Sequence, residues 1–239
     1  PLYKRGSAFI PGNYRGIHLT PILAKLAERV IGRQLVTFLQ SGKFGSHQWA
    51  FTPGMSARDL VTALMMSWIL AICSGYKIGG YLGDITGAFH RVFKDYLLAK
   101  LCSAGVGDQF LNFLLSYLQP RRAVVVVEGV ASDEFEIANQ VFQFSTSLSL
   151  FSDVTQPAAS TGGEPSIFAD DLSVFQKFDR KKENNECLRT MHVCRARVHN
   201  WGRSNRVAFD PVKEHSIIIH SSQGEGDPFK LLGLLVDCK

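Results

Sequence analysis

Three aspartates lie next to apolar segments, where burying a charged carboxylate costs free energy unless a positive charge or a hydrogen-bond donor compensates it. Asp84 ends an apolar segment, and Asp170 and Asp171 stand together between two apolar runs. If the fold brings these carboxylates together, their repulsion requires a compensating cation. Oxygen-only ligation by a few carboxylates suits Mg²⁺ or Mn²⁺, which bind substrate phosphates in their remaining positions. Two such ions about 4 Å apart would clamp an in-line phosphoryl displacement.

Each acidic motif also has a purely structural interpretation. An Asp-Asp pair is a common polar turn, and a single aspartate can end a strand. Either motif alone leaves both interpretations open, whereas the two motifs together favour a metal site.

The hydrophobic pattern predicts the elements that must position these aspartates. Residues 77–84 fit a buried strand, and residues 166–175 fit a hairpin with Asp170 and Asp171 at its turn. Residues 144–165 show no hydrophobic period. The irregular alternation of helices and strands predicts an α+β fold. The other expected elements are helices from Thr20 onward and over 59–73, 96–103, 110–118 and 184–204, a hairpin over 123–142, and short strands over 208–237.

Length and composition exclude several classes of protein. The chain has 239 residues, of which 46% are hydrophobic and 20% charged, which excludes a disordered tail and a collagen-like chain. The net charge of +5 permits a polyanionic partner without requiring one. Five cysteines without repeated spacing favour a reducing compartment over a disulfide framework. The longest uncharged run, residues 60–76, is short for a bilayer span of about 20 residues, so no membrane partner is expected.

Five segments resemble, in the same order, the motifs of reverse transcriptases from non-LTR retrotransposons. Residues 13–20 (NYRGIHLT) resemble the family's NYRPISLT, and residues 48–56 (QWAFTPGMS) resemble its QyGFRpGrST. Residues 84–92 (DITGAFHRV) are similar to DisKAFDrV, and residues 168–171 (FADD) to the YADD box. Residues 209–213 (FDPVK) are similar to lNpxKt. Residues 25–31 (KLAERVI) and 231–233 (LLG) are similar to the family's K-x-x-E-R-x-I and yLG, so the resemblance covers nearly the whole chain.

The resemblance implies the fingers and palm of a right-hand polymerase, with the thumb largely absent. The fingers would take about residues 1–79 and 118–142, and the palm about residues 80–117 and 143–239. The implied activity is RNA-directed DNA polymerisation, the two-metal transfer of dNTPs onto a DNA primer along an RNA template. The chain begins with Pro rather than Met, so we expect further domains of a longer polyprotein, in the nucleus or cytoplasm.

The resemblance also assigns catalytic roles. Asp84, Asp170 and Asp171 would bind two Mg²⁺ or Mn²⁺ ions, with the backbone carbonyl of Ile85 as an additional ligand. Lys213 matches a lysine suggested to protonate the leaving pyrophosphate, which is a general-acid role.

Further residues match positions that contact the nucleotide or the primer. Arg15 matches an arginine that contacts the triphosphate, where a guanidinium fork suits phosphate. Phe89 matches the aromatic residue under the sugar that rejects a 2′-hydroxyl. Gln143 matches a residue that lines the nucleotide and the template strand. Leu232 and Gly233 match the turn that supports the primer end.

Residues 144–154 depart from the family's pattern. Phe144 stands where the family has a Gly that permits close backbone approach, and the helix that supports the template is expected to be shortened. One alternative is therefore a catalytically inactive remnant that only binds nucleic acid. Another alternative is the palm of an RNA-dependent RNA polymerase. Two residues argue against it: Ala169 stands where such a polymerase has a Gly before the Asp pair, and Phe89 would block a ribose.

Two other groups of residues allow functional interpretations that the pattern does not favour. Cys187, His192, Cys194 and His199 lack the tight Cys spacing of a structural zinc site, and both cysteines share an apolar helical stripe, so core packing is favoured. The basic run 180–182 is interpreted as a solvated loop, with contacts to backbone phosphates as the alternative.

Overall fold

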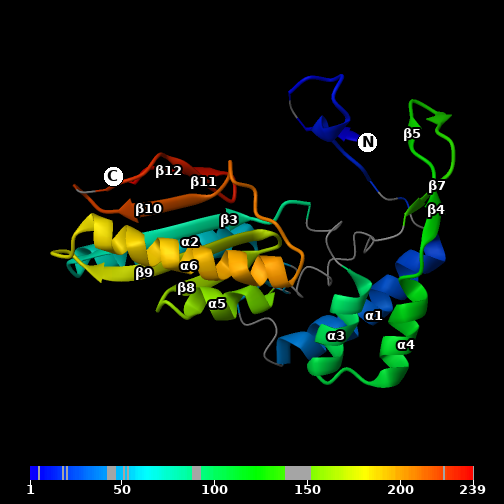
Figure 1. The fold of residues 1–239 in the computed structure, drawn as a ribbon, viewed down its shortest axis with the longest axis horizontal. Coiled ribbons are helices and arrows are strands. Elements are labelled where there is room, and N and C mark those ends of the chain that lie inside the picture. The colour runs from blue at the N-terminus through cyan, green and yellow to red at the C-terminus, as the bar shows by residue number, and fades with distance from the viewer. Residues whose placement is uncertain are drawn as a thin grey trace. The chain divides into compact units, whose positions relative to one another are not determined.

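The chain has two compact units in the computed structural model (Figure 1). The first unit comprises residues 1–35 and 89–144, and the second comprises residues 36–88 and 145–239. These units are defined only by how densely their residues pack together. The division of the chain into fingers and palm therefore stays a prediction. The structure describes residues 1–4, 6–17, 19, 21–41, 47–50, 52, 54–87, 93–137, 152–222 and 224–238.

The first unit consists mainly of helices with three small antiparallel strand pairs. The phenol of Tyr117 donates a hydrogen bond to Glu28, and the Arg121 guanidinium lies 4.6 Å from the centre of the Tyr117 ring. The hydrogen bond joins α4 to α1, and the Arg121 contact packs the start of β4 on the end of α4. Its helices are α1 (Ile22–Ser41, which continues into the second unit), α3 (Lys94–Ser103), α4 (Asp108–Tyr117) and the 3-10 helix η1 (Pro11–Asn13). Its strand pairs are β1 (Leu2–Tyr3) with β2 (Tyr14–Arg15), β4 (Arg121–Ala123) with β7 (Phe135–Ile137), and β5 (Val126–Val127) with β6 (Val130–Ala131).

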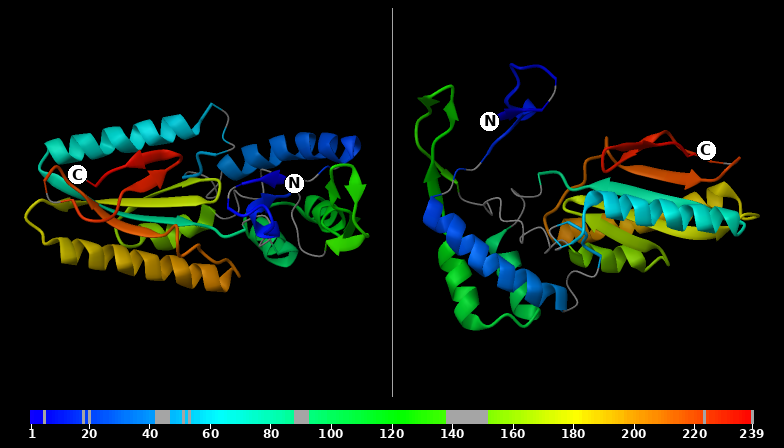
Figure 2. Two further views of the ribbon diagram at one scale, coloured as in Figure 1. Left: turned by 90° about the horizontal axis from the view of Figure 1, so that it is seen from above. Right: turned by 180° about the vertical axis from the view of Figure 1, so that it is seen from behind.

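The second unit is built on a four-stranded antiparallel sheet with the strand order β10–β3–β9–β8. Helix α2 covers one face of this sheet, and α6 covers the other with the short helix α5 (Figure 2). A hairpin of β11 and β12 adds Phe229 and Leu231 to the core on the α2 face. The bounds are β3 Tyr76–Asp84, β8 Glu164–Phe168, β9 Asp171–Asp179, β10 His215–Ile219, β11 Phe229–Leu231, β12 Leu234–Val236, α2 Ala57–Cys73, α5 Thr155–Ala159 and α6 Asn184–Ser204.

Strand β3 is buried on both faces, which requires small residues where the neighbours are large. A Cβ at Gly79 would lie 2.5 Å from the Phe178 ring, and one at Gly80 would lie 2.7 Å from the Phe175 ring. The second of these rings packs against Trp68 of α2 with ring centres 4.6 Å apart. The two glycines therefore allow large aromatic rings to pack closely against the strand that ends on Asp84.

The α+β prediction is confirmed, and most predicted elements form close to their expected bounds. Cys187 and Cys194 are fully buried on α6, as the prediction of core packing requires, and this favours core packing over a zinc site. Thr20, the expected start of the first helix, lies outside the described residues. None of the described helices is long and apolar enough to cross a bilayer.

Helix α5 is a short regular element within residues 144–165, which show no hydrophobic period. Its sequence, TQPAA, has no helical period to detect over five residues. The helix is set by tertiary contacts, because Val154 and Ala158 are completely buried and α5 packs against both α6 and β8.

Candidate active site

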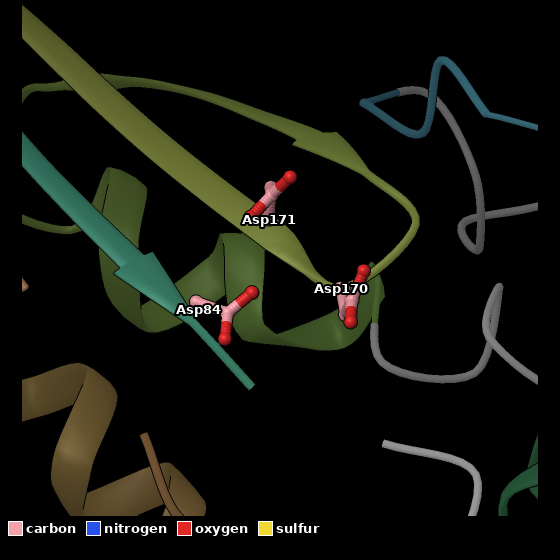
Figure 3. A group of neighbouring side chains, drawn as sticks. All are labelled: Asp84, Asp170 and Asp171. Carbon is pink, nitrogen blue, oxygen red and sulfur yellow. The ribbon is translucent and has the colours of Figure 1, made fainter. Parts of the chain in front are cut away.

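The sheet brings the three predicted aspartates together at one end. Asp84 closes β3 and Asp171 opens β9, and the two residues are direct partners in the antiparallel register. Asp170 lies in the turn between β8 and β9. Each of the three offers an oxygen within 4.8 Å of the others, as Figure 3 illustrates. Within the described part of the chain, this is the one group of three or more acidic, His or Cys side chains that could hold an ion.

The turn that carries Asp170 lies one residue earlier in the chain than the sequence predicts. Phe168 pairs directly with Asp171, so only Ala169 and Asp170 form the turn and Asp171 belongs to the strand. Ala169 has a φ of 60°, a left-handed conformation that usually selects glycine in a two-residue hairpin turn. The Asp170 carbonyl accepts a hydrogen bond from the Ile85 N–H at 3.1 Å, which ties the turn to the end of β3.

The side chain of Gln48 holds the strained turn. Its Oε1 accepts hydrogen bonds from the backbone N–H groups of Ala169 and Ala50, both at 3.0 Å. Around it, the N–H of Trp49 donates to the Ile167 carbonyl and the N–H of Ile167 donates to the His47 carbonyl, at 2.9 and 2.8 Å. Gln48 is only 5% exposed, so losing these bonds would leave buried polar groups unsatisfied.

Lys213 lies against the acidic cluster. Its Nζ is 2.7 Å from Oδ2 of Asp84, and this hydrogen bond raises the pKa of the lysine. The backbone beside it is held to β3, because the Asp210 N–H donates to the Asp84 carbonyl at 2.9 Å. Lys213, to which the resemblance assigns a general-acid role, therefore lies beside the carboxylates.

Glu214, the next residue, is a buried anchor for this segment. Its carboxylate is 2% exposed and accepts hydrogen bonds from the Tyr81 phenol at 2.6 Å and from Arg195 at 2.8 Å. The ring of His199 is also within 2.7 Å. Glu214 thus joins β3, α6 and the segment that carries Lys213.

The cluster has excess negative charge in the absence of a bound cation. Desolvation of its carboxyl group, a hydrogen bond with Asp84 and the charges of Asp170 and Asp84 raise the pKa of Asp171 to about 7. One lysine does not neutralise three carboxylates, and all the side-chain donors are oxygens. This donor set fits Mg²⁺ or Mn²⁺, which bind carboxylates and retain waters or phosphates.

The raised pKa predicts how the stability of the metal-free chain depends on pH. Because the Asp171 pKa is about 7 in the fold and near 3.8 in the unfolded chain, the folded state binds the extra proton. This contribution is fully present below about pH 4 and is lost as the pH rises through about 7. We expect the unfolding temperature in EDTA to fall between pH 5 and pH 8 more steeply in the parent chain than in Asp171→Asn. Equal slopes would contradict the assignment.

The other predicted site residues differ in what the structure describes of them. Leu232 and Gly233 form the predicted turn, joining β11 to β12 with φ values of 49° and 91°. Arg15 belongs to β2 in the first unit. Phe89 and Gln143 lie outside the described residues, as do residues 144–151 of the departing segment.

Comparisons with known proteins agree with the motifs. No family model matches the chain. It is 26% identical over 215 residues to a probable RNA-directed DNA polymerase from transposon X-element of Drosophila melanogaster, covering 87% of this chain and 23% of that protein. It is 30% identical over 120 residues to the corresponding protein from transposon BS, covering 50% of this chain and 13% of that protein. The chain thus spans less than a quarter of these relatives.

Solved structures with the same fold include telomerases from Candida species. An apo telomerase from Candida tropicalis has a TM-score of 0.61 at 11% identity over 90% of this chain and 44% of the other. A Candida albicans telomerase, solved with a fragment of telomeric RNA, has a TM-score of 0.55 at 10% identity over 90% of this chain and 37% of the other. The resemblance to reverse transcriptases of retrotransposons is confirmed in sequence, and the polymerase-like α+β fold is confirmed in structure.

Proposed function

We propose that this chain is the polymerising part of a retrotransposon RNA-directed DNA polymerase. The substrates would be dNTPs, a DNA primer and an RNA template. The observation that carries the proposal is the convergence of Asp84, Asp170 and Asp171 at the end of two paired strands. The sequence relatives, which are named as RNA-directed DNA polymerases, support the same reaction class.

In this proposal the three aspartates hold two divalent ions, with the Ile85 carbonyl as an additional ligand. The ions, when bound, supply the charge that stabilises an in-line displacement at phosphorus. Lys213 starts from a position 2.7 Å from Asp84, and its raised pKa keeps it protonated at neutral pH. It can therefore act as the general acid that donates a proton to the leaving pyrophosphate.

The remaining assignments follow the family's motifs. Arg15 would contact the triphosphate, Phe89 would exclude a 2′-hydroxyl, and Gln143 would line the nucleotide and template. The turn of Leu232 and Gly233 would support the primer end.

Metal binding can be tested without polymerase activity. Because a ligand that binds only the folded state stabilises it, Mg²⁺ or Mn²⁺ at about 5 mM should raise the unfolding temperature of the parent chain. The double variant Asp170→Asn/Asp171→Asn should lose this shift, because it keeps the shape of the site and removes two charges. No shift in the parent, or the same shift in the variant, would sink the metal-site proposal.

A second candidate function is favoured by the segment 144–154. In that candidate the chain is a remnant that binds nucleic acid without polymerising it, because Phe144 occupies the place of the family's glycine. Primer extension by a chain with a Gly-containing, family-like segment at 144–154 separates the two candidates. Extension after this repair supports the enzyme, and its absence even with a thumb domain appended supports the remnant.

A further inference from the structure

A second charged site lies at the opposite end of β3 from the aspartates. It is an open cavity of about 740 Å³, which is large enough for a nucleotide-sized ligand. Lys77, near the start of β3, lines it, whereas Asp84 ends the strand roughly 20 Å away at the usual rise per residue. The cavity is therefore separate from the candidate active site.

Lys77 is a buried cation without a described acidic partner. Its side chain is 2% exposed, and its Nζ donates a hydrogen bond of 2.8 Å to the neutral amide oxygen of Asn184. No ion pair found among the described residues includes it. An ammonium group has three donors and is costly to bury without an opposing charge. The site therefore lacks a negative partner for Lys77.

The surroundings of Lys77 add to the positive potential. Asn184 is the first residue of α6, whose helix dipole places a partial positive charge at this end. Arg180, Lys181 and Lys182 line the same cavity. Desolvation and the charges of Arg180 and Lys77 lower the pKa of the buried His220, which shows that these cations act on the interior nearby.

Two carboxylates, Glu183 and Glu225, also line the cavity. Glu183 stands at the N-cap of α6 but makes no capping hydrogen bond with its side chain. Four cationic side chains therefore line the cavity beside two acidic ones, and Lys77 is the most buried of the four.

We propose that this cavity binds a phosphate group, supplied either by the backbone of a nucleic acid strand or by a free polyphosphate. A phosphate would give Lys77 the opposing charge that it lacks. The flexible ammonium groups of Lys181 and Lys182 suit an anion that enters from solvent. This site goes beyond the proposed polymerase reaction, and it requires neither the aspartates nor their ions.

The test measures binding in EDTA, so that the aspartate site does not contribute. The probes are a fluorescently labelled single-stranded RNA, followed by anisotropy, and tripolyphosphate, followed by the unfolding temperature. We expect Lys77→Met to weaken binding of at least one probe by about tenfold or more, the size of a lost charge-assisted contact. If RNA is the probe affected, the dependence of its binding constant on salt concentration should also become weaker, by the amount expected for about one phosphate contact.

Two further variants keep the result interpretable. Lys181→Ala/Lys182→Ala changes only the rim and should weaken binding without altering the fold. Glu225→Gln removes a competing negative charge and should tighten binding. Arg122→Ala, on an exposed strand of the first unit, is the matched control for a general loss of positive charge.

Competition between the two probes identifies the source of the phosphate. RNA that is displaced only by high tripolyphosphate indicates a strand site, whereas tripolyphosphate binding without RNA binding indicates a free ligand. The proposal is overturned if Lys77→Met stays folded and binds both probes as the parent does. It is also overturned if the rim variant and Glu225→Gln leave both affinities unchanged.

Discussion

Replacement of Asp84 by Asn should abolish detectable primer extension in a chain repaired with a Gly-containing segment at 144–154. Asp84 contributes to the shared carboxylate cluster and also pairs with Lys213, so the substitution weakens metal binding and releases the lysine. We expect extension of a DNA primer on an RNA template to fall by at least about 1,000-fold, which corresponds to about 4 kcal/mol of transition-state stabilisation. Gel analysis of a labelled primer measures this loss.

The fold should survive this replacement, because removing one charge relieves the repulsion within the cluster. The unfolding temperature in EDTA should therefore not fall, which separates lost chemistry from lost structure. Asp227→Asn, an exposed aspartate of the same unit, is the matched control and should extend primers as the parent does. Extension by Asp84→Asn within tenfold of the repaired parent would refute the catalytic assignment.

Replacement of Gln48 by Met should lower extension by about 100-fold, although Gln48 is not among the carboxylates. Methionine has a similar length but cannot accept the two N–H bonds that fix Ala169 and Ala50. The turn would then lose the contact that keeps Ala169 at positive φ, and Asp170 would be held only by the hydrogen bond from Ile85 to its carbonyl. Loss of positioning alone can cost about two orders of magnitude in rate.

The metal dependence of the rate distinguishes this effect from general destabilisation. We expect Gln48→Met to need more Mg²⁺ for half-maximal extension, and Gln48→Glu to recover part of the loss, because a carboxylate can accept the same two bonds. Thr52→Ala is the matched control, since the Thr52 hydroxyl donates a hydrogen bond of 2.8 Å to the backbone carbonyl of Gln48. Unchanged metal dependence in Gln48→Met would show that the residue serves stability alone.

The sequence was sufficient to predict the acidic cluster, because its parts lie at the ends of strongly apolar strands. Residues 77–84 and 166–175 have the length and composition of buried strands, and the observed strands β3, β8 and β9 place the aspartates as expected. Lys213 could be predicted only through the family's motif. Nothing in its local pattern indicates that it reaches Asp84.

The supporting residues could not be predicted because their partners are distant in the chain. Gln48 meets Ala169 and Glu214 meets Tyr81, contacts that depend on tertiary packing. The matched motif of residues 48–56 was the one signal that pointed to Gln48. For Glu214, the only signal was its place after the matched lysine. The bounds of helix α5 also depend on tertiary contacts, since its five residues carry no detectable period of their own.

The pairing of Asp84 with Asp171 has a consequence for how the protein forms during translation. At about 5–20 residues per second, the ribosome needs several seconds to pass from β3 to β9. During this interval β3 has neither of its sheet neighbours, because β9 and β10 both follow the intervening segment. Its exposed edges are then open to pairing with other nascent chains. We therefore expect soluble yield to depend on translation speed or chaperones, and ion binding to appear only after this late strand pairing.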